Sequence, residues 1–371
     1  MKICITLGTR PEIIKMSPVI RECEKRGLDY FILHTGQHYS YKMDRVFFEQ
    51  LELLDAKYNL DVGSGTHAEQ TGKILIGVEK ILQKEKPDVV LLEGDTNTVL
   101  AGALAAAKLH VKVGHVEAGL RSYDRRMPEE INRVLTDHCS DYAFAPTEKA
   151  RQILLSEGIP DEKIFVTGNT IVDAVYQNLS ISRDRINPLN ELELVPREYF
   201  LVTAHRQENV DIKKRFKGII KGLELVAAEF GLPVIYPIHP RARKMMNHFG
   251  LKANGIEFIE PLDYPSFLQL ESKAKLVLTD SGGVQEETCI LGIPCVTLRD
   301  NTERHETLEI GSNILAGTNA KNILSATEEM LNKQTLGKFD QNASLNWRNP
   351  FGDGRAGERS IRILKERTRE K

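Results

Sequence analysis

The sequence alternates short, continuous apolar runs with longer amphipathic stretches, and this alternation limits the folds that are open to it. The first series of apolar runs is KICITLG, DYFILHTG, DVVLLEGD, VKVGHVEA and IFVTGN. Between them, residues 12–26, 68–85 and 97–109 have apolar side chains three or four positions apart, as in an amphipathic helix. Strands that are apolar throughout are buried on both faces, so the pattern predicts a parallel sheet covered by helices on both sides.

The same alternation then restarts with a second series of strand-like runs. This series is YFLVTAH, PVIYPIHP, IEFIEPL, KLVLTDSGG and PCVTLRD. A chain of 371 residues is long enough for two domains. We therefore predict two doubly wound α/β domains facing each other across a cleft, over residues 1–169 and 170–355, with a helix at 356–371 that packs back on the first domain.

Composition excludes some classes of function. The net charge is −2, with acidic and basic residues interspersed, so we do not expect a nucleic-acid partner. The longest run of small apolar residues, TVLAGALAAAKL, is too short to cross a bilayer, and the sequence begins directly with a strand pattern. We expect a cytoplasmic protein without membrane attachment. The five cysteines form no C-x-x-C pair and are expected to be small core residues.

The segment LTDSGGVQEE places a glycine turn between a predicted strand and a predicted helix. Glycines allow a ligand to approach the backbone, and the amides at a helix start favour an anion such as a diphosphate. The turn therefore suits a diphosphate, and Glu287, one turn into the helix, would be available to ribose hydroxyls. The alternative is an ordinary turn that needs glycine for its backbone angles.

A second turn of this kind, LGTRPEIIK, carries the cations Arg10 and Lys15 near the start of a helix. It has no G-x-G-x-x-G pattern, which argues against a tightly bound nicotinamide dinucleotide at this position.

The segment GHVEAGLRSYDRRMPEEINR is rich in both carboxylates and arginines. A solvated loop is the usual meaning of such a charge run. Glu117, however, ends a buried strand, where it cannot cap a helix and where an ionised carboxylate is costly unless it is paired. Glu129 follows Pro128 in the first turn of a predicted helix, so it serves either the helix dipole or catalysis. Asp95, in EGDTNTV, is either a helix cap or a further acid.

His205 ends the first strand of the second domain, and Arg304, in RDNTERHE, would reach either an anion or a nearby glutamate. No H-E-x-x-H or comparable ligand spacing occurs among the other histidines considered, so no metal is expected. These histidines are His34, His38, His67, His115 and His239.

Nine strings occur in order between residues 8 and 354: GTRPEIIKM, GDTNT, GHVEAGLRS, PEEINR, TGNTIVDA, TAHRQEN, SGGVQEE, RDNTER and NPFGDG. Together they closely resemble the non-hydrolysing UDP-N-acetylglucosamine 2-epimerases over essentially the whole chain. The resemblance implies the GT-B fold of two Rossmann-like domains. It also implies reversible conversion of UDP-N-acetylglucosamine to UDP-N-acetylmannosamine, for cell-surface glycan synthesis, without a nicotinamide, metal or other cofactor.

In the family's scheme, the C1–O bond to UDP breaks and the C2 proton leaves, giving 2-acetamidoglucal and UDP; readdition then delivers a proton to the other face. Two faces of one carbon need acid/base groups on opposite sides, so more than one carboxylate is expected. The resemblance assigns this role to Asp95, Glu117 and Glu129. It assigns stabilisation of the departing diphosphate to His205 with Arg10. The implied substrate contacts are Arg10, Lys15, Phe267 near the uracil, Ser281, Gly282, Gly283, Glu287 at the ribose, and Arg304.

Members of this family are typically homodimers, and bacterial members can be activated by a second UDP-N-acetylglucosamine. For that pocket the resemblance suggests Gln37, Gln70, Arg206 and His239. Three alternatives stay open: a hydrolysing epimerase that releases N-acetylmannosamine and UDP, a retaining UDP-glycosyltransferase, and a catalytically silent nucleotide-sugar sensor. A sensor would be marked by a lost carboxylate or histidine, and none of those named above is lost.

Overall fold

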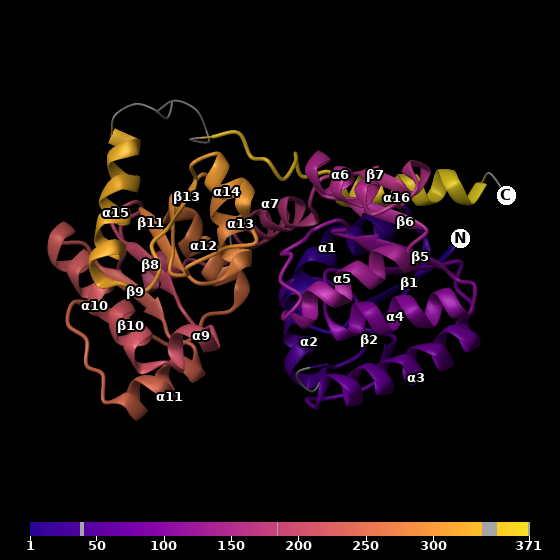
Figure 1. The fold of residues 1–371 in the computed structure, drawn as a ribbon, viewed down its shortest axis with the longest axis horizontal. Helices are drawn as coiled ribbons and strands as arrows, with labels where there is room; N and C mark the ends of the chain where they lie inside the picture. Colours follow the sequence, from indigo (N-terminus) through magenta and orange to yellow (C-terminus); the bar gives the residue numbers. More distant parts are fainter. Residues whose placement is uncertain (38–40, 184, 336–346, 370–371) are drawn as a thin grey trace. The chain divides into compact units, whose positions relative to one another are not determined.

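The computed structural model describes residues 1–37, 41–183, 185–335 and 347–369. The chain forms two compact units, and the predicted pair of doubly wound α/β domains is confirmed (Figure 1). Unit 1 comprises Met1–Gln177 with Phe351–Lys371, and unit 2 comprises Asn178–Pro350. The helix α7 (Thr170–Ser182) runs across the division between the units.

Unit 1 is built on a parallel sheet of seven strands in the order β3-β2-β1-β4-β5-β6-β7. The strands are β1 (Lys2–Leu7), β2 (Asp29–His34), β3 (Tyr58–Asn59), β4 (Val89–Glu93), β5 (Lys112–Val116), β6 (Tyr142–Ala145) and β7 (Ile164–Val166). The central strands β1 and β4 are almost entirely buried, as their continuous apolar sequence predicts. The sequence analysis missed β3 and β6, which are short and lie at or next to an edge of the sheet.

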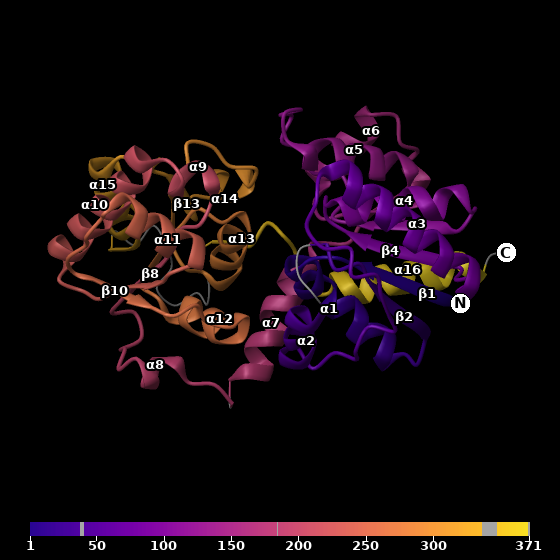
Figure 2. The same cartoon turned by 90° about the horizontal axis from the view of Figure 1, so that it is seen from below.

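Helices cover both faces of this sheet (Figure 2). They are α1 (Arg10–Lys25), α2 (Tyr41–Gln50), α3 (His67–Glu85), α4 (Asn97–Lys108), α5 (Pro128–Cys139), α6 (Glu148–Ser156) and α16 (Ala356–Arg369). On one side α4 contacts both α3 and α5, and another contact joins α1 to α16. The start of α16 is fixed by the Asp173 carboxylate, which accepts hydrogen bonds from Ala356 N at 3.1 Å and Gly357 N at 3.0 Å.

Unit 2 has a parallel sheet of six strands in the order β10-β9-β8-β11-β12-β13. Its strands are β8 (Phe200–Thr203), β9 (Val234–Pro237), β10 (Ile256–Ile259), β11 (Leu276–Thr279), β12 (Cys295–Thr297) and β13 (Asn313–Leu315). Its helices are α8 (Pro188–Glu191), α9 (Gln207–Val210), α10 (Lys213–Phe230), α11 (Pro240–Phe249), α12 (Tyr264–Lys273), α13 (Gly282–Leu291), α14 (His305–Glu309) and α15 (Ala320–Thr335). The edge strand β13 was not predicted from the sequence.

The apolar residues of the central strands and the inward helix faces form the cores of the two units. All five cysteines are free, and four of them are buried: Cys4, Cys23, Cys289 and Cys295. None of the helices within the described residues has the length and hydropathy needed to span a membrane.

Candidate functional site

In each sheet the strand order reverses at one point, and some of the predicted site residues follow the strands on either side of it. In unit 1 the point falls between β1 and β4, which are followed by Arg10 and Asp95. In unit 2 it falls between β8 and β11, which are followed by His205 and Ser281. In open parallel sheets, ligands bind beyond the carboxyl ends of the strands at this reversal. The topology therefore places one candidate site on each unit.

In unit 1, Lys15 lies beside Glu93 and Glu117, and Glu12 interacts with Glu93; we call these four residues the Lys15 cluster. Lys15 Nζ is 2.6 Å from Glu117 Oε1 and 3.4 Å from Glu93 Oε1, and all three side chains are buried. Asn169 Nδ2 donates to the same Glu117 oxygen at 3.1 Å. Lys15 was predicted to contact the substrate, but here it pairs with carboxylates from the ends of two strands.

Glu117 adopts a left-handed backbone conformation, with φ of 70° directly after β5. For a residue with a Cβ this conformation costs about 1–2 kcal/mol. Strain of this kind persists where the surrounding structure enforces it, and it is concentrated at functional sites. The conformation and the bond to Lys15 together fix the direction of the Glu117 carboxylate.

Glu12 and Glu93 supply the other two carboxyls of the Lys15 cluster. Glu12 belongs to a capping box at the start of α1 and accepts hydrogen bonds from Gly8 N, Thr9 N and Thr96 Oγ1. Burial raises the pKa of Glu12 to about 7, although these donors oppose the shift. Burial raises the pKa of Glu93 well above its usual value; Glu117 and Glu12 add to this and Lys15 opposes it.

Asp95 lies just before α4, and the Arg133 guanidinium pairs with its carboxylate. The helix cap is instead Thr96, so the capping role considered for Asp95 is wrong. Arg133 Nη1 also lies 2.5 Å from Glu130 Oε2. Glu129, the predicted acid, precedes Glu130 in the first turn of α5 and is partly exposed. Asp95 and the start of α5 therefore share one buried arginine.

The charged segment GHVEAGLRSYDRRMPEEINR begins within β5, and several of its side chains belong to a buried polar network. His115 Nδ1 lies 2.6 Å from Asp137 Oδ1, and its Nε2 lies 2.8 Å from the carbonyl oxygen of Gly94. Arg121 Nη1 is 2.7 Å from Asp137 Oδ2. Burial opposes ionisation of Asp137, but His115 and Arg121 lower its pKa. A Cβ at Gly119 would lie 2.5 Å from the Ala150 carbonyl oxygen, so only glycine fits the turn.

Part of this segment is solvated, as the sequence allowed. Asp124 and Arg126 form an ion pair at 2.8 Å, and the Arg126 side chain is 90% exposed. The same 20 residues therefore contain both buried polar groups and an ordinary surface ion pair.

Gln37 and Gln70, suggested for a regulatory pocket, are buried together in unit 1. Gln70 Nε2 donates to the Gln37 carbonyl oxygen at 2.8 Å, and Gln37 Oε1 accepts from Thr98 N at 3.0 Å. Their neighbour His38 lies outside the described residues. The other two suggested residues, Arg206 and His239, belong to unit 2, where the rings of His239 and His205 are 5.5 Å apart.

In unit 2, Asp280 connects the ends of β8 and β11. Its buried carboxylate accepts hydrogen bonds from the backbone N–H groups of His205 at 3.1 Å and Arg206 at 3.0 Å. Asn209 Nδ2 adds a third donor at 3.0 Å. Asp280 therefore fixes the backbone that carries His205. The sequence analysis quoted this aspartate only as the end of a strand.

The helix α13 begins at Gly282, beside three arginines and two glutamates that we call the arginine cluster: Arg206, Arg299, Arg304, Glu286 and Glu303. Arg304 Nε is 2.9 Å from Glu286 Oε1, and Arg299 Nη1 is 2.9 Å from Glu303 Oε2. Burial opposes ionisation of Glu303, but the three arginines lower its pKa to about 2. With both carboxyls ionised, these five side chains carry one excess positive charge next to a helix start, which favours an anion. A third glutamate, Glu208, also lies 3.4 Å from Arg206, but its side chain is 54% exposed.

Gly282 and Gly283 differ in their surroundings. A Cβ on Gly282 would lie 2.6 Å from Glu303 Oε1, whereas at Gly283 the nearest atom would be Ser281 Oγ at 3.9 Å. Gly282 therefore gives the Glu303 carboxylate room to approach the helix start.

Glu287, predicted to bind ribose, lies in a second group of buried carboxyls. Tyr264 Oη donates to Glu287 Oε1 at 2.9 Å. Glu271 is fully buried beside it, and burial followed by the nearby Glu287 raises the pKa of Glu271 well above its usual value. Phe267, predicted near the uracil, belongs to α12. It is partly buried and packs against an apolar core cluster of unit 2.

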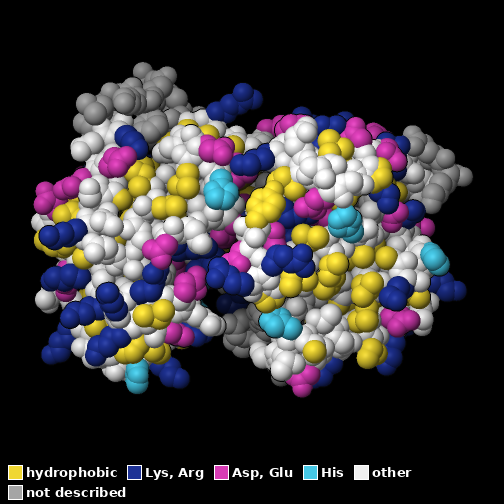
Figure 3. Space-filling view, viewed as in Figure 1, with side chains coloured by type: hydrophobic (Ala, Val, Ile, Leu, Met, Phe, Trp, Pro, Cys, Tyr) yellow, Lys and Arg dark blue, Asp and Glu magenta, His cyan; other side chains and the backbone are white. Residues whose placement is uncertain are grey.

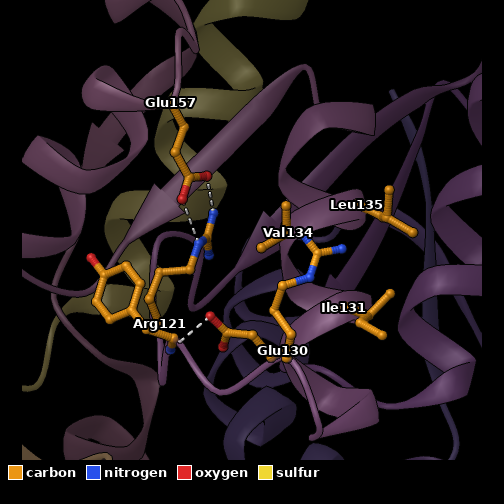
Figure 4. A pocket seen from close by; sticks show the side chains of 8 residues that line it. Arg121, Glu130, Ile131, Val134, Leu135 and Glu157 are labelled. Carbon is orange, nitrogen blue, oxygen red and sulfur yellow. Dashed lines mark hydrogen bonds and ion pairs between the residues drawn. The ribbon is translucent and has the colours of Figure 1, made fainter.

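A cavity of about 420 Å³ lies on the surface of unit 1 beside α5. Arg121 and its partner Glu157 form one side, and Ile131, Val134 and Leu135 form another (Figure 4). The cavity does not contain Lys15, Asp95 or Glu117.

Over the described parts of the chain, no group of three or more His, Cys, Asp or Glu side chains is arranged to hold a metal ion. Basic and acidic side chains are interspersed over the visible face of the molecule (Figure 3).

Comparisons with known proteins give one consistent result. Residues 21–365 match the family model described as UDP-N-acetylglucosamine 2-epimerase. A UDP-N-acetylglucosamine 2-epimerase of Methanocaldococcus jannaschii is 57% identical, over 98% of this chain and 99% of the relative. A solved structure of the M. jannaschii enzyme, in complex with UDP-GlcNAc and UDP, covers 99% of this chain and all of its own at 56% identity, with a TM-score of 0.87.

A more distant relative acts on a different sugar. The UDP-2,3-diacetamido-2,3-dideoxy-D-glucuronate 2-epimerase of Pseudomonas aeruginosa is 42% identical over 90% of this chain and 93% of its own length.

Proposed function

Because the chain belongs to the UDP-N-acetylglucosamine 2-epimerase family and has its GT-B-like two-domain fold, we propose that it interconverts UDP-N-acetylglucosamine and UDP-N-acetylmannosamine without hydrolysis. The reaction proceeds by loss of UDP and of the C2 proton to give 2-acetamidoglucal, followed by readdition. The observation that carries the proposal is the Lys15 cluster, with the strained Glu117 carboxylate paired to a buried lysine.

The chemistry needs acid/base groups that can act at C2, and unit 1 provides them. Glu117 is fixed by Lys15 and Asn169, and Asp95 by Arg133. Glu129, which is partly exposed at the start of α5, is the third acid/base candidate. Positioned carboxylates of this kind typically contribute 10²- to 10⁴-fold to proton transfer.

The diphosphate needs positive charge and N–H donors, and unit 2 provides these. Ser281, Gly282 and Gly283 lie at the start of α13 beside the arginine cluster. Arg304 is the cation that we assign to the nucleotide sugar, and Glu287, oriented by Tyr264, is assigned to the ribose with Phe267 near the uracil. His205, on backbone fixed by Asp280, stabilises the departing UDP together with Arg10.

Two further assignments concern regulation and assembly. We assign Gln37, Gln70, Arg206 and His239 to a second UDP-N-acetylglucosamine site, and expect activity to rise more steeply than linearly with substrate concentration. We also expect a homodimer, because α5 exposes Ile131 and Leu135 next to the exposed Tyr123. Light scattering on the full chain tests the dimer.

Product analysis tests the proposed reaction. The full chain is incubated with UDP-N-acetylglucosamine, and the sugars are followed by proton and phosphorus NMR. We expect both UDP-linked sugars at equilibrium and little free sugar. Free N-acetylmannosamine with stoichiometric UDP would establish the hydrolysing reaction instead. The diacetamido-glucuronate substrate of the Pseudomonas relative is the control for sugar specificity, and faster turnover of it would contradict the assigned substrate.

A further inference from the structure

The charges of the Lys15 cluster do not balance, and this inference rests on the function proposed above. Glu93 and Glu117 share Lys15, and Glu12 interacts with Glu93, so the cluster would carry two excess negative charges if all three carboxyls were ionised. Glu93 and Glu12 are 2% exposed, and the side chain of Glu117 is 7% exposed. Uncompensated charge is costly in such surroundings, and a buried carboxyl responds by keeping its proton.

The donors around each carboxyl differ. Glu117 accepts from Lys15 at 2.6 Å and Asn169 at 3.1 Å, and Glu12 accepts from two backbone amides and the Thr96 hydroxyl. Among the described residues, the only ion-pair partner of Glu93 is Lys15, whose Nζ lies 3.4 Å from Glu93 Oε1. This contact does not form a hydrogen bond, so the buried Oε1 has no hydrogen-bond donor within the described residues. Glu93 is therefore the carboxyl least able to exist as an anion.

Glu93 and Glu117 face the same ammonium group, because Lys15 Nζ is 3.4 Å from Glu93 Oε1 and 2.6 Å from Glu117 Oε1. Two ionised carboxylates are acceptors only, so a hydrogen bond between these two side chains requires a proton on one of them. We propose that Glu93 holds that proton and donates it to the Glu117 carboxylate, as a positioning residue that keeps Glu117 ionised and aimed for its reaction at C2.

The remaining charged groups near Glu93 already have partners. Glu93 ends β4, which pairs with β5, where His115 bonds Asp137 and the Gly94 carbonyl oxygen. Asp95, two residues further along the chain, pairs with Arg133. From α1, Glu12 and Lys15 face Glu93. Lys15 is therefore the cation that stabilises this carboxyl pair.

Two substitutions at Glu93 test the effect of its proton separately from the effect of its side-chain volume. Glu93→Gln keeps an N–H donor for Glu117 but cannot ionise, whereas Glu93→Leu keeps a similar volume and removes the donor. Glu22→Gln is the matched control, because Glu22 is a buried glutamate on the same helix as Lys15 and pairs with Arg26 instead. The readout is kcat/KM for epimerisation as a function of pH.

We expect Glu93→Gln and Glu22→Gln to keep the wild-type pH profile. In Glu93→Leu the ionised Glu117 loses a donor, so the acid limb of the profile should move up by about one pH unit. The rate on that limb should then fall about tenfold, with a smaller change above it. A downward shift in Glu93→Gln would mean that Glu93 is an anion in the wild type, and would overturn the proposal. An unshifted Glu93→Leu profile would overturn it as well.

A second readout needs no catalysis. A carboxyl that stays protonated in the folded state makes stability fall as pH rises above the value at which the unfolded carboxyl ionises. The melting temperature of Glu93→Gln should therefore rise relative to wild type between pH 4.5 and 8, while that of Glu22→Gln should not. A Glu93→Gln protein that is less stable than wild type at pH 8 would contradict the neutral carboxyl. Absence of any turnover in wild type would overturn only the proposed function.

Discussion

The two units have the same kind of sheet, with the same strand reversal, yet they carry opposite charge at the reversal point. Unit 1 places Glu93 and Glu117 beside Lys15, with Glu12 next to Glu93, and a further acid, Asp95, beside Arg133. Unit 2 places Arg206, Arg299 and Arg304 around two glutamates at the start of α13. Topology explains where both candidate sites are, and the side chains decide what each can do; we propose proton transfer in unit 1 and anion binding in unit 2.

Each unit contains a buried pair of glutamates, and the two pairs differ in their partners. In unit 1 the pair Glu93 and Glu117 has a lysine within 3.4 Å. In unit 2 the pair Glu271 and Glu287 has the Tyr264 hydroxyl. A lysine stabilises an anion that can act as a base, whereas a neutral hydroxyl orients a carboxyl and leaves its partner protonated. The comparison predicts that substitutions in unit 1 change the rate and substitutions in unit 2 change nucleotide affinity or stability.

The largest effect is expected from Glu117→Gln. The amide can still accept from Lys15 and Asn169, but it cannot take a proton, so kcat should fall by about 10²- to 10⁴-fold. The Kd for UDP, measured by calorimetry, should stay at the wild-type value. Near-normal turnover, or a tenfold weaker UDP complex, would contradict the assignment of proton transfer to unit 1 and nucleotide binding to unit 2.

Removing Arg304, in unit 2, should change the affinity for UDP. Because Arg304 Nε pairs with the buried Glu286 at 2.9 Å, the double variant Arg304→Gln/Glu286→Gln avoids leaving an unpaired buried charge. Loss of a charged hydrogen bond to phosphate should raise the Kd for UDP by about 10- to 100-fold. Glu286→Gln alone is the control and should bind UDP at least as tightly as wild type. Unchanged affinity in the double variant would remove Arg304 from the nucleotide site.

Two adjacent glutamates of α5 test the same comparison within unit 1. Glu130 accepts from Ser122 N and Tyr123 N at 2.9 Å and from Arg133, so Glu130→Gln should lower the melting temperature by about 2–6 °C. Glu129→Gln should leave the melting temperature unchanged and reduce turnover. Normal turnover in Glu129→Gln would exclude Glu129 from the acid/base chemistry.

The smallest effect is expected at Glu271, whose pKa burial raises well above the ordinary value of 4.5. Above pH 4.5 the unfolded carboxyl ionises while the folded one keeps its proton, so this group makes the wild type less stable as pH rises. Glu271→Gln has no carboxyl that can ionise, so it does not lose stability in this way as pH rises. Its melting temperature should match wild type near pH 4.5 and exceed it by about 2–4 °C at pH 8. An ionised Glu271 would instead give a difference that does not grow with pH.

The sequence predicted the sheets because their central strands are apolar without interruption. The strands β3, β6 and β13 escaped notice because they have two to four residues and lie at or near sheet edges. Position after a strand also identified Arg10, Asp95, Glu117, His205 and the glycine turn at Ser281. Within each unit these residues lie at the same edge of the sheet, because the carboxyl ends of parallel strands meet there.

The partners of these residues could not be predicted, because they come from distant parts of the chain. Lys15 and Glu117 are 102 positions apart, and Asp280 bonds backbone 75 positions away. Glu93 ends a strand as an apparently ordinary polar residue, and its meaning depends on burial beside Glu117. A glutamate at the end of an otherwise apolar strand was the available signal, since such a carboxyl needs a partner or a proton.

The central claim is that the carboxylates of unit 1 remove and return the proton at C2. Incubation of the full chain with UDP-N-acetylglucosamine in heavy water, followed by NMR of the recovered sugars, tests this directly. The account predicts deuterium at C2 in both UDP-N-acetylglucosamine and UDP-N-acetylmannosamine. Epimerisation with the original hydrogen retained at C2, or no incorporation into either sugar, would contradict it.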